Sequence, residues 1–356
     1  MIHVFHVLPT LGIGGAERLL LSLIALRDAQ RVRYTLLLPE GSRTAKAALL
    51  GARVLLYRGK LTLPLLLGVL RREKPDVIHT HGTLLPRIAG RLFGGASLIN
   101  SKHCALLPPQ QPRLYRALTD VTVATGEDCR SLLLRAGIPE GEITLIPNTP
   151  PPPRTVSFAE RERLRAHYGL GQKDFAVGLC GRLVPVKGHK TLLLAAKRLS
   201  SLPFRFFFLG DGEKKGELLR QIQDSRLSHK VTLLGAWEDP APFFGMLDAA
   251  VNCSLGSETA SLALSEGMAL GLPTAASNIP GNRQTLKNGG IFFPPGNAEA
   301  LARALLCLRA ERERYSRMAR EAYAQRPSAE SMCRAYEELY LSAQSARLEK
   351  RICESL

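Results

Sequence analysis

The sequence lacks the features of secreted, disulfide-bonded and membrane-spanning proteins. Its seven cysteines, an odd number, are scattered without a C-x-x-C spacing, which argues against a disulfide framework and against a zinc site. Residues 61–70 are apolar but contain Pro64, and the run is too short to span a bilayer. Residues 1–7 lack the basic region and long apolar core of a signal peptide. We therefore expect a protein of the reducing cytoplasm.

Two common nucleotide-binding motifs are also missing. Gly12, Gly14 and Gly15 form a glycine-rich turn between a strand-like and a helical segment, where backbone can approach a phosphate closely. Glu17, however, occupies the third glycine position of the G-x-G-x-x-G dinucleotide fingerprint. No G-x-x-x-x-G-K-[ST] sequence is present either. A nicotinamide-dependent enzyme is therefore disfavoured, and a simple tight turn remains an alternative for this segment.

Negative charge is scarce relative to positive charge. The chain has 48 Lys and Arg against 31 Asp and Glu, a net charge of +17. Such an excess favours an anionic partner, which could be nucleic acid, an anionic membrane face or a phosphorylated substrate. The basic residues are dispersed, and no zinc finger, RNP motif or basic heptad segment is present. We therefore expect a membrane surface or an anionic substrate, and no nucleic acid.

What the 356 residues do contain is a regular alternation of strand-like and helical segments, with length enough for two domains. This alternation predicts an α/β fold built from doubly wound parallel sheets. The proline-rich residues 148–154 interrupt it and suggest a hinge between the domains. The strands are expected at residues 2–7, 34–38, 54–57, 77–79, 97–100, 121–123, 143–146, 174–180, 204–209, 231–234, 249–253 and 274–276. The helices are expected at residues 19–26, 43–50, 63–72, 84–93, 130–136 and 328–347.

Three histidines lie at or just after the ends of two of the expected strands in the first half of the chain. His79 and His81 could chelate a metal, but no acidic or cysteine partner lies nearby in the sequence, so we expect no metal site. His103 closes another strand, where an imidazole can donate to a sugar hydroxyl or exchange protons near neutral pH. A structural role in the core is the ordinary alternative for each of them.

Two basic residues follow a buried strand in the second half. Arg182 and Lys187 belong to a glycine-containing turn immediately after residues 174–180. A guanidinium fork and an ammonium point charge together suit the recognition of a diphosphate.

Two glutamates surround a predicted helix start further along. Ser261 is a candidate N-cap, and Gly271 with Pro273 ends the helix. Glu258 lies before this helix and Glu266 within it. Free backbone N–H groups at a helix start bind phosphate, and carboxylates accept hydrogen bonds from sugar hydroxyls. The pattern suits a ligand that carries both a phosphate and sugar hydroxyls, although Glu266 could also belong to a solvated helix face.

The order and spacing of these motifs resemble those of the family 4 retaining glycosyltransferases. The resemblance covers nearly the whole chain and implies the GT-B fold, in which two Rossmann-like domains face a cleft. The positions that carry it are Gly14-Gly15-Ala16-Glu17, His103, Asn148, Gly181-Arg182, Lys187-Gly188, Gly210-Asp211-Gly212 and Glu258-x7-Glu266.

The resemblance assigns roles to individual positions. Arg182 and Lys187 match the residues that bind the donor diphosphate, and His103 matches a histidine near the transferred sugar. Glu258 matches the carboxylate that contacts the donor sugar, and Glu266 the one that holds the ribose hydroxyls. Further donor contacts are implied for the backbone of Gly14, Gly15, Ala236, Ala260, Ser261 and Leu262.

The implied activity is metal-independent transfer of a sugar from a nucleoside-diphosphate donor to a saccharide or lipid-linked saccharide, in cell-surface polysaccharide or lipopolysaccharide synthesis. Residues 1–150 would bind the acceptor and residues 151–327 the nucleotide sugar. Residues 328–356 would cross back as a helix to the N-terminal domain. No cofactor is expected, and the enzyme would be cytoplasmic or peripheral on the inner face of the membrane. The alternatives are a UDP-sugar epimerase of the same fold, or a non-catalytic basic protein that binds membranes or nucleic acid.

Three places depart from the family pattern: Thr259, Val186 and residues 281–284. The phosphate-binding positions match the family pattern, but the sequence does not identify the donor sugar or the acceptor.

Overall fold

The chain forms two compact units. The computed structural model describes residues 1–8, 15–42, 45–103, 112–149, 151–256, 258 and 261–355. Unit 1 comprises residues 1–151 and 327–356, and unit 2 comprises residues 152–326. Within the described ranges, no helix is both long enough and apolar enough to cross a membrane.

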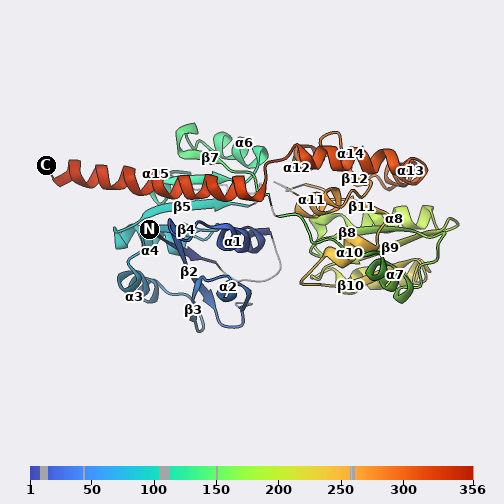
Figure 1. The fold of residues 1–356 in the computed structure, drawn as a ribbon, viewed down its shortest axis with the longest axis horizontal. Helices are drawn as coiled ribbons and strands as arrows, with labels where there is room; N and C mark the ends of the chain where they lie inside the picture. Colours follow the sequence, from blue (N-terminus) through green and yellow to red (C-terminus); the bar gives the residue numbers. More distant parts are fainter. Residues whose placement is uncertain are drawn as a thin grey trace. The chain divides into compact units, whose positions relative to one another are not determined.

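Unit 1 is built on a parallel sheet of seven strands (Figure 1). The strand order β3-β2-β1-β4-β5-β6-β7 reverses between β1 and β4, as in a Rossmann-like doubly wound sheet. The α/β architecture expected from the sequence is therefore confirmed. The strands are β1 (Ile2–Val7), β2 (Val32–Pro39), β3 (Arg53–Tyr57), β4 (Val77–Thr80), β5 (Ser97–Lys102), β6 (Val121–Ala124) and β7 (Ile143–Leu145).

Helices connect these strands. Helix α6 (Glu127–Arg135) begins three residues earlier than the predicted helix 130–136. Glu127 and Asp128 place negative charge in its first turn, where the helix dipole favours it. Helix α2 (Ala45–Leu49) covers only part of the predicted helix 43–50, and residues 43 and 44 lie outside the described ranges. The helices are α1 (Gly15–Leu26), α2 (Ala45–Leu49), α3 (Leu63–Glu73), α4 (Leu85–Phe93), α5 (Pro112–Ala117) and α6 (Glu127–Arg135).

The C-terminal helix α15 (Ala329–Ser355) completes unit 1. It packs against α1 and the strands β1, β4 and β5 (Figure 1). Tyr336 and Tyr340 are fully buried in the same hydrophobic cluster as the central strands. Ser97 adds a side-chain hydrogen bond of 2.8 Å to the carbonyl of Ala343. The helix is therefore part of the core of this unit.

Unit 2 repeats the topology with a parallel sheet of six strands. The order β10-β9-β8-β11-β12-β13 reverses between β8 and β11. Its strands are β8 (Phe175–Cys180), β9 (Phe204–Leu209), β10 (Val231–Gly235), β11 (Ala249–Asn252), β12 (Thr274–Ser277) and β13 (Ile291–Phe293). Its helices are α7 (Phe158–His167), α8 (His189–Arg198), α9 (Lys215–Asp224), α10 (Ala241–Met246), α11 (Leu262–Ala269), α12 (Pro280–Leu286), α13 (Ala298–Ala310) and α14 (Arg312–Ala324).

Each sheet thus has a point at which the strand order reverses. In open parallel sheets, ligands bind beyond the carboxyl ends of the strands at this point. In unit 1 it lies between β1 and β4, and in unit 2 between β8 and β11. Candidate functional residues lie at both of these places.

Candidate active site

A lysine and a glutamate meet at the reversal point of unit 2. Strands β8 and β11 pair in parallel, with Val177 opposite Ala249. Lys187 ends the 3-10 turn η2 (Pro185–Lys187) that follows β8, and Glu258 follows β11. The Lys187 ammonium donates a hydrogen bond to Oε1 of Glu258 and forms an ion pair with it. Two residues from separate predicted motifs therefore lie in direct contact.

Glu258 is buried and held on more than one side. The hydroxyl of Ser254 donates to its Oε1 at 2.6 Å, and Nδ2 of Asn252 lies 3.5 Å from the same oxygen. A buried carboxylate is stable only when it is paired and hydrogen-bonded, and these contacts supply both. The carboxylate is therefore fixed in place beside the Lys187 ammonium.

Helix α11 begins beside this pair. Ser261 is its N-cap, as predicted, with Oγ accepting a hydrogen bond from the backbone N–H of Leu264 at 3.4 Å. The same Oγ accepts a 2.8 Å hydrogen bond from Asn252, which also faces Glu258. The first N–H groups of a helix lack intrahelical partners and carry partial positive charge. Glu258, Lys187 and this positive helix end therefore form one local site.

Two glycines allow the loops of this site to pack closely. Gly188 has φ 65°, and a Cβ there would lie 2.0 Å from the carbonyl oxygen of Cys253. A Cβ on Gly281 would lie 1.9 Å from the carbonyl oxygen of Glu258. Any larger residue at either position would push the Lys187 turn or the Glu258 loop out of place.

Four other predicted site residues are placed at different points. Arg182 and Ala236 are exposed, in the loops that follow β8 and β10. Glu266 is buried within α11, eight residues after Glu258. Gly15 is the first residue of α1 in unit 1.

Gly14 and Ala260 lie outside the described residues, as does Thr259, one of the departures from the family pattern.

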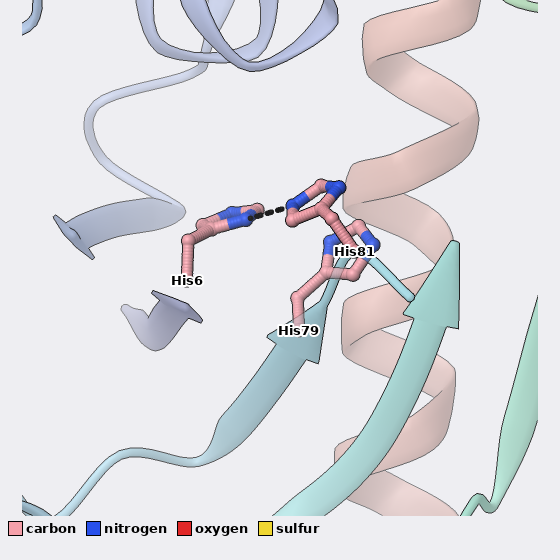
Figure 2. Close-up of side chains that lie close together, drawn as sticks. All are labelled: His6, His79 and His81. Carbon is pink, nitrogen blue, oxygen red and sulfur yellow. Dashed lines mark hydrogen bonds between the residues drawn. The ribbon is translucent and has the colours of Figure 1, made fainter. Parts of the chain in front are cut away.

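Four histidines gather at the reversal point of unit 1. His6 in β1 lies directly opposite His79 in β4, and His81 and His103 follow β4 and β5. Nδ1 of His6 and Nε2 of His81 are hydrogen-bonded at 3.0 Å (Figure 2). Nδ1 of His81 and Nε2 of His103 are also 3.0 Å apart. His103 is therefore the end of a connected row of imidazoles.

His79 is anchored separately. Its Nδ1 lies 2.8 Å from the hydroxyl of Tyr340, and its Nε2 lies 2.8 Å from the hydroxyl of Ser101. Its ring stacks on that of His81, with centroids 4.5 Å apart. Helix α15 therefore supports the row of histidines through Tyr340.

All four rings are neutral near pH 7. Burial lowers the pKa of His6, His79 and His81 well below the usual value, and the neighbouring imidazoles lower it further. Burial, with a contribution from Lys102, lowers the pKa of His103 to about 4. A neutral imidazole has one N–H donor and one acceptor nitrogen.

No sequence pattern pointed to His6. In the structure, however, His6 lies beside His79 and His81, for which the sequence showed no third candidate metal ligand. One ring nitrogen from each of these three histidines lies within 4.8 Å of the others, a spacing at which a metal could be held. The signal that could have found His6 is its position near the end of the first strand, because β1 and β4 are neighbours in a Rossmann-like order.

Comparison with known families covers both units. Residues 13–149 match the family described as Glycosyltransferase Family 4, and residues 160–325 match Glycosyl transferases group 1. The chain belongs to the GT4-type glycosyltransferases. It is therefore an enzyme, and the family resemblance seen in its sequence motifs is confirmed.

Its curated relatives are bacterial enzymes. The lipopolysaccharide core biosynthesis glycosyltransferase LpsE of Rhizobium meliloti is 28% identical over 319 residues, which cover 86% of this chain and 88% of LpsE. The UDP-Gal:alpha-D-GlcNAc-diphosphoundecaprenol alpha-1,3-galactosyltransferase of Escherichia coli is 27% identical over 261 residues, 67% of each chain.

Solved structures confirm the GT-B fold of the glycosyltransferase. Alr3699/HepE of Anabaena, in complex with UDP and glucose, has a TM-score of 0.84 at 20% identity and covers 96% of this chain and 100% of its own. A glycosyltransferase from Rickettsia africae gives 0.83 at 18% identity, with coverage of 96% and 98%.

Proposed function

We propose that this enzyme transfers a sugar, with retention of anomeric configuration, from a nucleoside-diphosphate donor to a saccharide or lipid-linked saccharide. The pathway would be the synthesis of a cell-surface polysaccharide or lipopolysaccharide. The relatives support this choice, since one acts in lipopolysaccharide core synthesis and another on a diphosphoundecaprenol-linked sugar. The UDP bound to Alr3699/HepE supports a nucleotide donor.

The observation that carries the proposal is the contact between Lys187 and Glu258 beside the start of α11. A nucleotide sugar has an anionic diphosphate next to a ring of hydroxyls. An ammonium and a positive helix end match the diphosphate, and a carboxylate within reach matches the hydroxyls. Glu258 would then hold the transferred sugar, while Glu266, further along α11, would hold the ribose.

The chemistry requires stabilisation of the leaving group. Negative charge develops on the diphosphate as the bond to the sugar breaks. Lys187, Arg182 and the backbone N–H group of Leu262 would stabilise that charge without a metal ion, whereas the N–H group of Ser261 already donates to the hydroxyl of Thr285 at 3.2 Å. The acceptor would attack on the same face that the diphosphate leaves, which retains the configuration without a covalent enzyme intermediate.

The two units would divide the substrates. Unit 2 would bind the nucleotide sugar, with Ala236 beside the base and Ala260 beside the distal phosphate or the sugar. Unit 1 would bind the acceptor and contribute His103 near the transferred sugar, with Gly14 and Gly15 near the donor phosphate.

The first test is a thermal-shift screen of the wild-type protein against UDP, GDP, ADP and their sugars. A ligand that binds only the folded state raises its stability, so one nucleotide series should raise the melting temperature. Product analysis with and without acceptor then separates the alternatives. A UDP-sugar epimerase would convert its substrate without acceptor, whereas a binding protein without activity would respond to no nucleotide sugar.

A matched pair of variants tests the role of the Lys187 charge. Lys187→Met should lower kcat/KM for transfer by about 10- to 150-fold, because a hydrogen bond to a charged group contributes about 1.5–3 kcal/mol. Lys190→Met removes the same charge from an exposed position three residues away and should have little effect. Equal rates for both variants would remove Lys187 from the diphosphate site.

A further inference from the structure

Unit 2 has a cavity at the end of its sheet opposite the candidate active site. The cavity has a volume of about 610 Å³, and its lining includes Phe175 at the start of β8, Pro203 before β9 and Asp248 before β11. Lys187 and Glu258, in contrast, follow the carboxyl ends of β8 and β11. Since β8 has six residues, roughly 20 Å of strand separates its two ends. The cavity is therefore distinct from the candidate active site.

Asp248, a buried carboxylate in the wall of this cavity, is shared by three arginines. Its Oδ1 accepts a 2.8 Å hydrogen bond from Nη2 of Arg161 and lies 2.9 Å from Nη2 of Arg312. Its Oδ2 accepts hydrogen bonds from Nη1 of Arg165 at 2.9 Å and from the backbone N–H of Ala176 at 2.8 Å. Each oxygen thus has two partners, and one negative charge offsets only one of three positive charges.

The three arginines differ in how far the protein uses their donors. Arg161 and Arg165 belong to α7, and both also donate hydrogen bonds to main-chain carbonyl groups. Arg312, the first residue of α14, has a half-exposed side chain and pairs with no described residue other than Asp248. The remaining N–H donors of Arg312 are therefore available to a ligand.

Two further cations line the cavity without an acidic partner. The guanidinium of Arg309 lies over the ring of Phe204, 5.5 Å from its centroid, and the side chain of Lys173 is exposed. Neither cation forms a hydrogen bond or an ion pair with a residue that the structure describes. Together with Arg312, they give the cavity three cationic groups whose donors are not used up within the protein.

Positive charge in the cavity lining exceeds negative charge. Burial lowers the pKa of Arg161, and the nearby charges of Arg165 and Arg312 lower it further, against the opposing effect of Asp248. Such crowding of like charges favours a counter-anion. A phosphate monoester carries a charge of about −1.5 to −2 at pH 7 and matches the excess. That excess is two positive charges, from Arg161, Arg165, Lys173, Arg309 and Arg312 against Glu162, Asp174 and Asp248.

We propose that this cavity is a second anion site, which binds a phosphate monoester through Arg309, Arg312 and Lys173. A guanidinium can hold two phosphate oxygens by parallel hydrogen bonds, and an ammonium adds a point charge. The volume lies in the range of small-ligand pockets, so the organic part of the ester also has room. A soluble phosphate ester and the phosphate headgroup of a lipid share this chemistry. The site goes beyond the proposed function and does not depend on it.

A purely structural cluster around Asp248 is the competing interpretation. It accounts for Arg161 and Arg165, which join α7 to the segment before β11. It does not account for Arg312, which adds a third positive charge to a carboxylate whose two oxygens already accept hydrogen bonds. Nor does it account for the two cations of the lining that lack acidic partners. Ligand binding is therefore the better account of these three side chains.

The test is isothermal titration of the full-length protein at low salt with inorganic phosphate and with glycerol 3-phosphate, a small monoester. The double variant Arg309→Gln/Arg312→Gln should weaken the binding of both by roughly tenfold or more, because two charged hydrogen-bond donors are lost. Arg303→Gln/Arg317→Gln is the matched control. It removes two charges from exposed positions of the same helices, α13 and α14, outside the cavity, and should leave the affinity nearly unchanged.

A further variant separates this site from the candidate active site, which also has cations that phosphate could meet. Lys187→Met removes one of those cations and should keep the binding of glycerol 3-phosphate. Binding that is lost in Lys187→Met and kept in Arg309→Gln/Arg312→Gln would place the ester in the candidate active site and overturn the proposal. Absence of binding to both the soluble ester and the lipid described next, or equal affinity in the double variant and its matched control, would overturn it as well.

Liposomes distinguish the two sources of the phosphate. Phosphatidic acid carries a phosphate monoester, whereas phosphatidylglycerol carries a diester, and the two can be compared at equal surface charge. A preference for phosphatidic acid that Arg309→Gln/Arg312→Gln loses and Arg303→Gln/Arg317→Gln keeps would assign the site to a lipid headgroup. Binding of glycerol 3-phosphate without such a preference would assign it to a soluble ester.

Discussion

At the scale of single residues, the two glutamates differ in their surroundings. Glu258 is paired with Lys187 and bonded by Ser254, in a loop whose path depends on Gly281. Glu266 is buried within a regular helix, where its direction is set by the helix itself. Glu258 therefore lies in the loop before α11, beside Lys187, whereas Glu266 belongs to the helix itself.

This difference leads to a prediction for the pair. Glu266→Gln should weaken the binding of the nucleoside diphosphate alone by about 10- to 150-fold, since a charged hydrogen bond contributes about 1.5–3 kcal/mol. Glu258→Gln should leave that affinity nearly unchanged and lower the transfer rate instead. Isothermal titration with the nucleoside diphosphate, followed by a transfer assay, measures both. Full nucleotide affinity in Glu266→Gln would contradict its assignment to the ribose.

The residues of the site were predictable to unequal degrees. Lys187, Glu258 and Ser261 could be found because each stands at a fixed offset from a strand or a helix start, and the structure brings these three together. The direct ion pair between Lys187 and Glu258, which are 71 residues apart, could not be foreseen, because it depends on the pairing of β8 with β11. His6 was missed for a similar reason, since its partners come from β4.

At the scale of elements, strands were predicted more completely than helices. Apolar runs of three to seven residues locate buried parallel strands well, and two of the predicted strands, β1 and β9, have the observed bounds. Most helices of unit 2 were left unassigned. Helix α14, for instance, buries only Ala319 and Ala322 within its 13 residues, which leaves little apolar pattern to read.

Helix α8 gives a prediction about pH. His189 is its first residue and is buried against Phe208, and burial together with Lys187 lowers its pKa to about 4. The unfolded chain takes up this proton below about pH 6.5, whereas the folded chain resists it. The stability due to the neutral ring is therefore complete above about pH 6.5 and is lost as the pH falls towards about 4.

His189→Gln should flatten this dependence by up to about 1.4 kcal/mol per pH unit. Urea denaturation of both proteins at several pH values between about 4 and 7 measures the difference in slope. His229→Gln, at an exposed position, is the control and should keep the wild-type slope. An unchanged slope in His189→Gln would show that folding does not lower the pKa of the His189 ring.

At the scale of the whole molecule, the charge of +17 exceeds what a single diphosphate requires. We propose that the excess holds the enzyme peripherally on an anionic membrane, where a lipid-linked acceptor would be found. The protein should sediment with liposomes that contain anionic lipid at low salt, and be released at about 1 M salt, where the Debye length is about 3 Å. Liposomes of neutral lipid are the control. No binding to anionic liposomes at low salt would contradict the proposal.

The path of the chain between the two units has a consequence for synthesis on the ribosome. Unit 2 is one continuous stretch, whereas unit 1 is assembled from residues on either side of it, with α15 following unit 2 in the chain. Unit 2 can therefore complete its core while unit 1 still lacks Tyr336 and Tyr340. The first part of unit 1 is therefore synthesised before unit 2, but its core is completed only by residues that come after unit 2. Until α15 has been synthesised, the apolar side chains of unit 1 that pack against Tyr336 and Tyr340 lack this cover.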